Sequence, residues 1–375
     1  MQPKRSRGFS LVELLVAMAI GLIGILVITQ AYVVSEEQKR STVSGGEAQQ
    51  NGILALQLLQ QDLLTAGYGI VGAGALGCVI NATNDNGVTP YLLRLVPAMV
   101  RADDPVAGTD SVTIMYGTAP GAVGPPAVLR VNHPVAATNF QLDNTIGFSI
   151  NSMFVVHQPG KPCTLLQATN AAQTAGNTIL QHTAVGSTYN VAANINFPQS
   201  PPYATSGYNS GSTVFNLGQP VNVRYQISAD KLVQVNLADG SNSITELADG
   251  IVAIRAQYAI DTANPHPAIP ATPLVANGDS LVNVYVDPRA DGTPNHAAFG
   301  TGSAAQIAAG WGRVYAVRVG IVSRSSLREK TDVSPASIEM WPGGPTHTVA
   351  DRKYRYKVYH TVVPLRNMLW RRPGI

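Results

Sequence analysis

The chain has two cysteines, Cys78 and Cys163, and their placement bears on two kinds of chemistry. No histidine lies close to either one at the spacing of zinc ligands, so the pair does not indicate a metal site. In an oxidising compartment the pair predicts a disulfide bond that closes a loop of about 85 residues and stabilises the fold by about 4 kcal/mol. Two buried free thiols and a disulfide between two molecules are the alternatives.

Other motifs that could bind or catalyse are weak. The seven histidines are scattered, and neither a serine-hydrolase elbow nor a catalytic acid pair stands out. Residues 72–77 satisfy G-x-G-x-x-G but lack the preceding strand and following helix of a dinucleotide site, so they predict a flexible connection. Residues 287–292 are faintly like a calcium loop, but they lack the Asp or Asn at the third position of the loop and the later glutamate, which favours a solvated turn. We therefore expect no enzymatic activity, no cofactor and no metal.

One charged side chain interrupts the apolar run of residues 9–34, and it is Glu13. As a helix, this run would be about 39 Å long, enough to cross a hydrocarbon core of about 30 Å. A carboxylate inside such a helix costs about 2.5–3.5 kcal/mol on insertion scales, so it usually has a partner charge. The alternative is that Glu13 lies near the cytoplasmic end of the helix and reaches the lipid headgroups.

The net charge of +3 comes from the residues before this run. Lys4, Arg5 and Arg7 precede it without any acid, so residues 9–375 carry 22 basic and 22 acidic side chains. Basic residues before a span predict a cytoplasmic N-terminus and place everything after the span outside the cytoplasm. The run is too long for the core of a secretory signal peptide, and no small-x-small cleavage site follows it. The near-neutral balance excludes a strongly basic nucleic-acid-binding protein and an acidic disordered tail.

The N-terminus resembles the class III leader of type IV pilins and type II secretion pseudopilins. The resemblance rests on a short basic leader ending in Gly8, an aromatic Phe9, Glu13 at the fifth position after Gly8, and the long apolar run. It implies that a prepilin peptidase cuts between Gly8 and Phe9 and methylates the new amine of Phe9. It also implies a partner for Glu13, namely the N-terminal amine of a neighbouring subunit in the filament. Pairing these two charges in apolar surroundings leaves neither of them uncompensated.

The helical pattern continues past the apolar run. Residues 35–67 predict an amphipathic continuation in which Ile53, Leu56, Leu59 and Leu63 lie along one side and pack on the chain's own globular domain. Gly45-Gly46 is a soft point, because each glycine costs about 1 kcal/mol relative to alanine in a helix. Gly67 is a suitable residue to end the helix.

From residue 68 onward, the sequence changes to short segments in which apolar and polar residues alternate, a pattern typical of strands. The chain is therefore expected to be α+β: a leader (1–8), a transmembrane helix (9–34), its amphipathic continuation (35–67) and a β-rich periplasmic domain (68–375). The domain should be antiparallel with long loops, and residues 228–231 predict a hairpin turn. The expected strands are 112–116, 148–156, 221–227, 232–237, 251–260, 281–286, 314–322 and 354–363.

Two C-terminal segments carry a narrower resemblance, to PilW-type minor pilins. Residues 317–325 are similar to their penultimate strand, and residues 359–367, which end in Leu-Arg-Asn, are similar to their final strand. Residues 66–69 also fit their helix exit. The resemblance implies a minor pilin that primes pilus assembly near the filament tip, with other minor pilins and the major pilin as partners. It implies a location in the inner membrane first and in the filament at the cell surface afterwards.

Two alternatives stay open. A type II secretion minor pseudopilin J would carry the same leader in a different machine. A DNA- or surface-binding tip module is a further alternative, because residues 351–372 hold seven basic side chains, one acid and interleaved aromatic residues. A simpler explanation is a strand with one solvent-exposed, positively charged face, followed by a short tail that contacts a partner pilin. We therefore do not expect nucleic acid as a partner.

Overall fold

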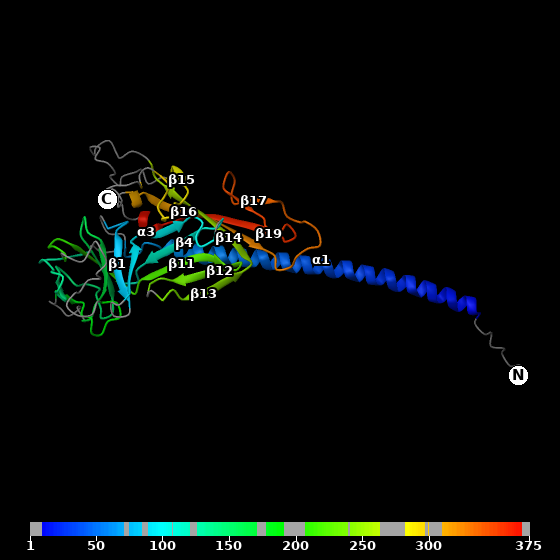
Figure 1. The fold of residues 1–375 in the computed structure, drawn as a ribbon, viewed down its shortest axis with the longest axis horizontal. Helices are drawn as coiled ribbons and strands as arrows, with labels where there is room; N and C mark the ends of the chain where they lie inside the picture. Colours follow the sequence, from blue (N-terminus) through cyan, green and yellow to red (C-terminus); the bar gives the residue numbers. More distant parts are fainter. Residues whose placement is uncertain are drawn as a thin grey trace.

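A single long helix organises the molecule. The structure is a computed structural model that describes residues 10–70, 75–84, 89–106, 108–120, 126–170, 178–190, 207–238, 241–262, 282–296, 299 and 310–369. Helix α1 (Leu11–Thr65) has 55 residues, and in Figure 1 its N-terminal half projects from the body while its C-terminal half lies along it. The helix runs without interruption through Gly45-Gly46, so the expected soft point is not a break. Gly67 has φ +82°, the left-handed conformation that lets a glycine end a helix.

The buried face of α1 differs from the predicted stripe. Leu59 and Leu63 are fully buried as expected, but Ile53 is 47% exposed and Leu56 is only partly buried. The predicted stripe followed large apolar side chains, whereas small residues let the sheets approach the helix closely along most of the contact. The buried residues of the helix are Ser44, Ala48, Gly52, Ala55, Leu59 and Leu63.

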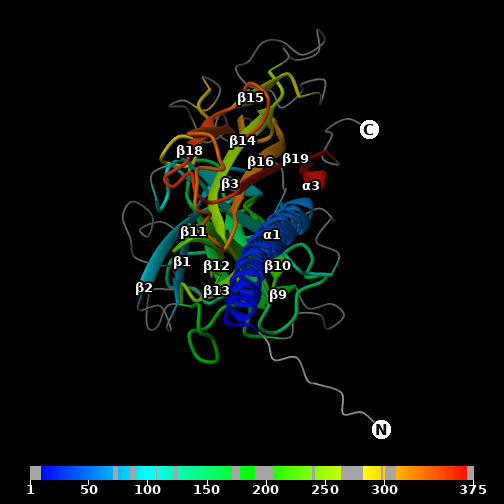
Figure 2. The same ribbon diagram turned by 90° about the vertical axis from the view of Figure 1, so that its right-hand side faces the viewer.

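Two antiparallel sheets pack against the C-terminal half of α1. Figure 2, viewed from the N-terminal end, shows β14, β16 and β19 above the helix and β11 to β13 to its left. The four-stranded sheet has the order β15-β14-β16-β19, and the five-stranded sheet has the order β13-β12-β11-β4-β3. The strands are β3 (Ala98–Arg101), β4 (Ser111–Tyr116), β11 (Val221–Ser228), β12 (Lys231–Asn236), β13 (Ile244–Asp249), β14 (Ile251–Ile260), β15 (Val284–Val286), β16 (Val314–Arg324) and β19 (Tyr356–Pro364).

The predicted hairpin is present between β11 and β12. Ser228 pairs with Lys231, and Ala229 and Asp230 both have positive φ, as a two-residue hairpin turn requires. The largest apolar core lies between the two sheets and α1, and it includes Leu59 and Leu63 of the helix with Trp311 and residues of both sheets. This core fixes the helix to the domain.

A third sheet forms the distal lobe (described residues from 75–95 and 118–217). Its order is β2-β1-β8-β7-β10-β5, and a two-stranded sheet β6-β9 lies beside it. The lobe has one apolar core of its own, and a second apolar core that also contains Ile70 and, from β4, Met115 joins it to the rest of the domain. The β1–β8 pair is parallel, which differs from the expected antiparallel arrangement. The strands are β1 (Val79–Asn84), β2 (Thr89–Arg94), β5 (Ala127–Val128), β6 (Asn139–Gln141), β7 (Met153–His157), β8 (Cys163–Gln167), β9 (Ile179–Gln181) and β10 (Thr213–Gly218).

A small flap covers the outer face of the four-stranded sheet. It contains β17 (Ser337–Glu339), β18 (Thr346–Thr348) and the buried Trp341, whose ring packs on Gly320 of β16. A short helix, α3 (Arg366–Leu369), follows β19. The strand predicted at 148–156 is partly wrong, because residues 148–152 form a turn and β7 begins only at Met153. The strand predicted at 281–286 is shorter than expected, since β15 begins at Val284.

Candidate functional site

The N-terminal half of α1 presents a bare apolar surface. Among the described residues, α1 is the helix that is long and apolar enough to cross a membrane, and the most apolar stretch of it touches no other part of the chain. Leu11, Ile20 and Ile28 are each at least 65% exposed. Glu13 lies in the first turn, where the helix dipole favours a negative charge. Gly8 and Phe9 lie outside the described residues.

The apolar half of the helix is held by a close contact in the other half. Gly52 faces the Tyr359 ring of β19 and the Ser323 hydroxyl of β16, and a Cβ atom at this position would overlap that ring. Gly46, two turns earlier, faces open space. Of these two glycines, Gly52 is the one at which a larger residue would not fit, because helix and sheet approach each other closely there.

A carboxylate fixes the rotation of α1 against the five-stranded sheet. The Tyr225 hydroxyl donates a hydrogen bond of 2.6 Å to Asp62 Oδ2, and Gln234 Nε2 donates to the Tyr225 hydroxyl at 3.0 Å. Burial and the adjacent Asp62 carboxylate raise the pKa of Tyr225, so the phenol stays protonated and keeps donating. Buried polar groups paired in this way tolerate little displacement.

The C-terminus of α1 is capped from the end of the chain. Asn367 Nδ2 donates to the carbonyl oxygens of Thr65 and Ala66, both at 3.0 Å. The last carbonyls of a helix have no partner within the helix, so a side-chain donor there stabilises its end. Asn367 is the last residue of the Leu-Arg-Asn segment. In the sequence this segment indicated a resemblance to the final strand of PilW-type minor pilins, and it was the feature that could have drawn attention to Asn367. Its capping role was missed because it depends on contact across the fold.

The two cysteines form the predicted disulfide bond. Cys78 and Cys163 are joined, with Cα atoms 5.9 Å apart, and they connect the segment before β1 to the first residue of β8. Cys163 is fully buried in the apolar core that joins the distal lobe to the rest of the domain. The bond therefore fastens the start of the domain to the middle of the distal lobe.

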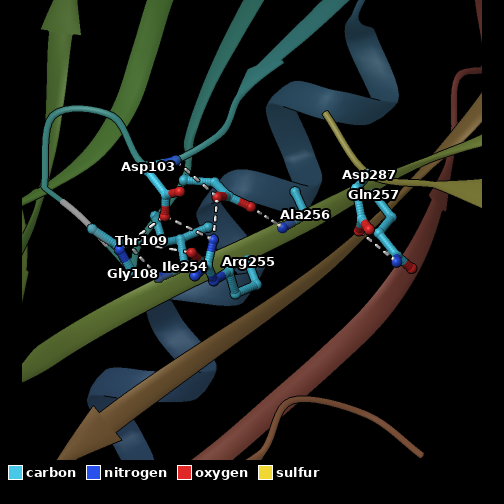
Figure 3. A network of polar contacts seen from close by, with 9 residues as sticks. Asp103, Gly108, Thr109, Ile254, Arg255, Ala256, Gln257 and Asp287 are labelled. Carbon is cyan, nitrogen blue, oxygen red and sulfur yellow. Dashed lines mark hydrogen bonds and ion pairs between the residues drawn. The ribbon is translucent and has the colours of Figure 1, made fainter. Parts of the chain in front are cut away.

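A polar network attaches the loop after β3 to strand β14 (Figure 3). Asp110 accepts hydrogen bonds from Arg255 Nη1 at 2.8 Å and from the Ala256 amide at 2.9 Å. Asp103 also accepts from Arg255, and the Ile254 amide donates to the Thr109 hydroxyl. Burial raises the pKa of Asp110, while these partners act in the opposite direction. Every carboxylate oxygen of Asp110 is engaged by β14, so the network is structural.

The structure describes part of each weak motif: the calcium-like segment, the G-x-G-x-x-G segment and the basic C-terminal segment. Asp287 accepts a hydrogen bond from Gln257 Nε2 at 2.8 Å, and Asp291 accepts from the Thr293 amide at 2.9 Å, so protein donors occupy both carboxylates of the calcium-like segment. The described part of the chain contains no group of three or more metal-ligating side chains. In the G-x-G-x-x-G segment, residues 72–74 lie outside the described residues, and a strand, β1, follows Gly77 shortly after. The basic residues 371 and 372 also lie outside the described part.

A long N-terminal helix, apolar for its first half and seated on an antiparallel β-rich domain for its second, is the arrangement of a pilin-like protein. Residues 3–29 match the prokaryotic N-terminal methylation motif, and residues 218–367 match the Type IV Pilus-assembly protein W family, PilW. These matches support a type IV minor pilin of the PilW type. The PilW match begins at Gly218, the last residue of β10, and ends at Asn367, so residues 75–95 and 118–217 of the distal lobe lie outside it.

One solved structure of a pilin was also found to be similar. A type IV-like pilin from Thermus thermophilus is 10% identical to this chain, with 85% of this chain and 97% of that chain covered and a TM-score of 0.32. No curated protein matches the sequence.

Proposed function

We propose that this chain is a minor pilin that primes type IV pilus assembly and is built into the filament at or near its tip. The observation that carries the proposal is the bare apolar half of α1 with Glu13 in its first turn. An exposed apolar helix of this length is stable only in lipid or against other apolar helices. The subunit would be held in the inner membrane first and then in the helix bundle of the filament.

Processing prepares the subunit for this transfer. A prepilin peptidase would cut between Gly8 and Phe9 on the cytoplasmic side and methylate the Phe9 amine. The N-methylation motif at residues 3–29 supports this step. The basic residues Lys4, Arg5 and Arg7 would keep the leader in the cytoplasm and place the β-rich domain in the periplasm.

Glu13 would select the position of each subunit in the bundle. Its carboxylate would pair with the N-terminal amine of a neighbouring subunit, which is another minor pilin or the major pilin. In apolar surroundings, an unpaired carboxylate costs far more than a paired one, so the pair forms at one register only. The protein would act by association, without catalysing a reaction.

The position of the distal lobe supports a place at the tip. In Figure 1 the lobe lies at the end of the body away from the N-terminus, beyond the region where α1 ends. In a bundle of parallel helices, this is the space that the domain of the next subunit toward the tip would need. A subunit with such a lobe fits best where no subunit lies above it.

The test compares two glutamates on the same helix. Glu13→Ala removes the carboxylate inside the apolar run, and Glu36→Ala removes one just after it. We expect both variants to insert in the membrane, and only Glu13→Ala to be lost from sheared filaments and from co-purified minor pilins. Equal incorporation of the two variants would contradict the proposed role of Glu13.

A further inference from the structure

Residues 325–334 lie against α1 just beyond the apolar run, and residues 351–357 are hydrogen-bonded to them. We call these two segments the collar. The Leu327 amide donates a hydrogen bond of 3.1 Å to Ser44 Oγ, and the Ser326 hydroxyl donates one of 2.8 Å to Glu47 Oε2. Further toward the N-terminus, Lys330 forms an ion pair with Glu37. In Figure 1 this part of the domain reaches furthest along α1 toward the N-terminus.

The collar is a fixed unit. Ion pairs join its two segments: Arg328 with Asp351 at 2.7 Å, Arg355 with Glu329 at 3.0 Å, and Arg352 with Asp332 at 3.2 Å. Backbone hydrogen bonds join the same segments, from the Glu329 amide to the Lys353 carbonyl and from the Val333 amide to the Arg352 carbonyl. Since the pairs are exposed, their stabilising effect is small, but the backbone bonds and the contacts with α1 set the position of the collar.

The collar lies at the level of the lipid headgroups, provided that α1 spans the membrane as in the proposed function. Glu37 is three residues past Val34, which is about 4.5 Å along the helix axis. The headgroup layer on each side of the hydrocarbon core is about 5–7 Å thick. Lys330, as the partner of Glu37, therefore lies within or next to this layer when residues up to Val34 fill the hydrocarbon core.

The side chains of the collar suit such a layer. Leu327 and Val333 are each 38% exposed, although both are apolar. The Lys330 side chain is 80% exposed, and a lysine can lay its alkyl stem on apolar surroundings while its ammonium group contacts phosphate. Together with residues 35–47 of α1, the collar holds eight basic and six acidic side chains. Because residues 9–375 are neutral in total, this excess of positive charge is local.

We propose that the collar is a docking surface for the anionic phospholipid headgroups of the outer leaflet of the inner membrane. Leu327 and Val333 enter the interface, and the basic side chains contact lipid phosphates. Basic side chains near an anionic surface are attracted to it, and apolar side chains add to the binding in proportion to the area buried. Docking would hold the unassembled subunit upright with its distal lobe directed away from the membrane.

The experiment measures contact with lipid at single positions. The full chain is reconstituted into phosphatidylcholine vesicles with or without phosphatidylglycerol, both containing a lipid with a nitroxide at the headgroup. Because Cys78 and Cys163 are bonded to each other, a cysteine introduced by Leu327→Cys is labelled selectively with a fluorophore. Val185→Cys, an 88% exposed position in the distal lobe, is the matched control, and Ile23→Cys with a nitroxide deep in the acyl chain reports insertion of the helix.

The expected result is quenching at position 327 several-fold stronger than at position 185 in phosphatidylglycerol vesicles, and a clear decrease without that lipid. Equal quenching at 327 and 185, with position 23 still quenched, would overturn the collar proposal and leave the membrane anchor intact. Absence of quenching at position 23 would overturn the anchor and the collar proposal together. A signal at 327 that follows protein density and ignores lipid composition would assign the collar to contacts between copies, which also overturns the proposal.

Discussion

Asn367 and Thr65 lie 302 residues apart in the chain, and a side-chain hydrogen bond of 3.0 Å joins them at the end of α1. Asn367→Ala removes this bond and the matching one to Ala66, so we expect the free energy of unfolding to fall by about 1–2 kcal/mol. Urea titration of the full chain in detergent measures this change. Arg366→Ala, an exposed neighbour, should change it by less than about 0.5 kcal/mol. An equal loss in both variants would mean that Asn367 contributes nothing as a cap.

The contact between Gly52 and Tyr359 leads to a second prediction. Gly52→Ala forces a Cβ into the Tyr359 ring and close to the Ser323 hydroxyl, so the ring or the helix must move, at a cost of about 1–3 kcal/mol. Gly46→Ala places the same atom in open space on the same helix and should stabilise the protein by up to about 1 kcal/mol. Thermal unfolding of both variants under the same conditions gives the comparison. If both variants shifted the unfolding temperature in the same direction, the close approach of helix and sheet would not be what requires a glycine at position 52.

The disulfide is predicted to matter mainly in the distal lobe. Replacing Cys78 and Cys163 by serine removes a bond across 85 residues and should cost about 4 kcal/mol. We expect limited proteolysis to cut first within the distal lobe, since the bond lies there and the helix core does not depend on it. The single variants Cys78→Ser and Cys163→Ser should show the same pattern. First cleavage in β14 to β19 would contradict this assignment.

Two buried histidines predict loss of stability in acid. His182 Nε2 and His133 Nε2 lie 2.9 Å apart, and burial lowers the pKa of His133 to about 4 and that of His182 well below its ordinary value. Above about pH 6.5 both imidazoles are neutral in the folded and unfolded states, so protonation of the two histidines does not lower the free energy of unfolding there. As the pH falls from 6.5 toward 4, the unfolded chain binds protons that the folded chain excludes, and His133 alone should cost about 3 kcal/mol.

The check on this prediction is a slope. The free energy of unfolding, measured by urea titration between pH 7 and pH 4, should fall more steeply in the parent protein than in a His133→Gln/His182→Gln variant. His360→Gln, which replaces an exposed histidine on β19, is the control and should keep the parent slope. If the free energy of unfolding changed with pH by the same slope in all three proteins, the histidine pair would not be the cause of the acid sensitivity.

The parts of the fold with strong local signals were predictable from the sequence. The helix, the strands β11, β12 and β14 and the hairpin between Ser228 and Lys231 follow from periodicity and turn residues. The order of the sheets and the distal lobe did not follow, because strands such as β1 and β8 are short and pair across the disulfide loop. Pairing of this kind depends on contacts far apart in sequence, which local patterns do not record.

The site shows the same division. Glu13 stood out because a lone carboxylate in an apolar run is costly, and the cysteines stood out because they are two. Ile53 was wrongly assigned to the buried face, since the close contact at Gly52 favours small residues that an apolar pattern does not count. Asn367 and the collar depend on how the end of the chain returns to the helix, and only the folded structure brings them together.

A processed pilin subunit begins at Phe9 and carries a methylated amine, and the mass of the mature N-terminus reports both features. The protein is isolated from membranes of cells that contain the prepilin peptidase, and its N-terminal peptide is analysed by mass spectrometry. We expect the chain to begin at Phe9, with its amine carrying one methyl group, and to keep its leader when Gly8→Ala is introduced. A mature chain that keeps residues 1–8, or one that is cut after the apolar run, would show that the chain is not processed as a pilin.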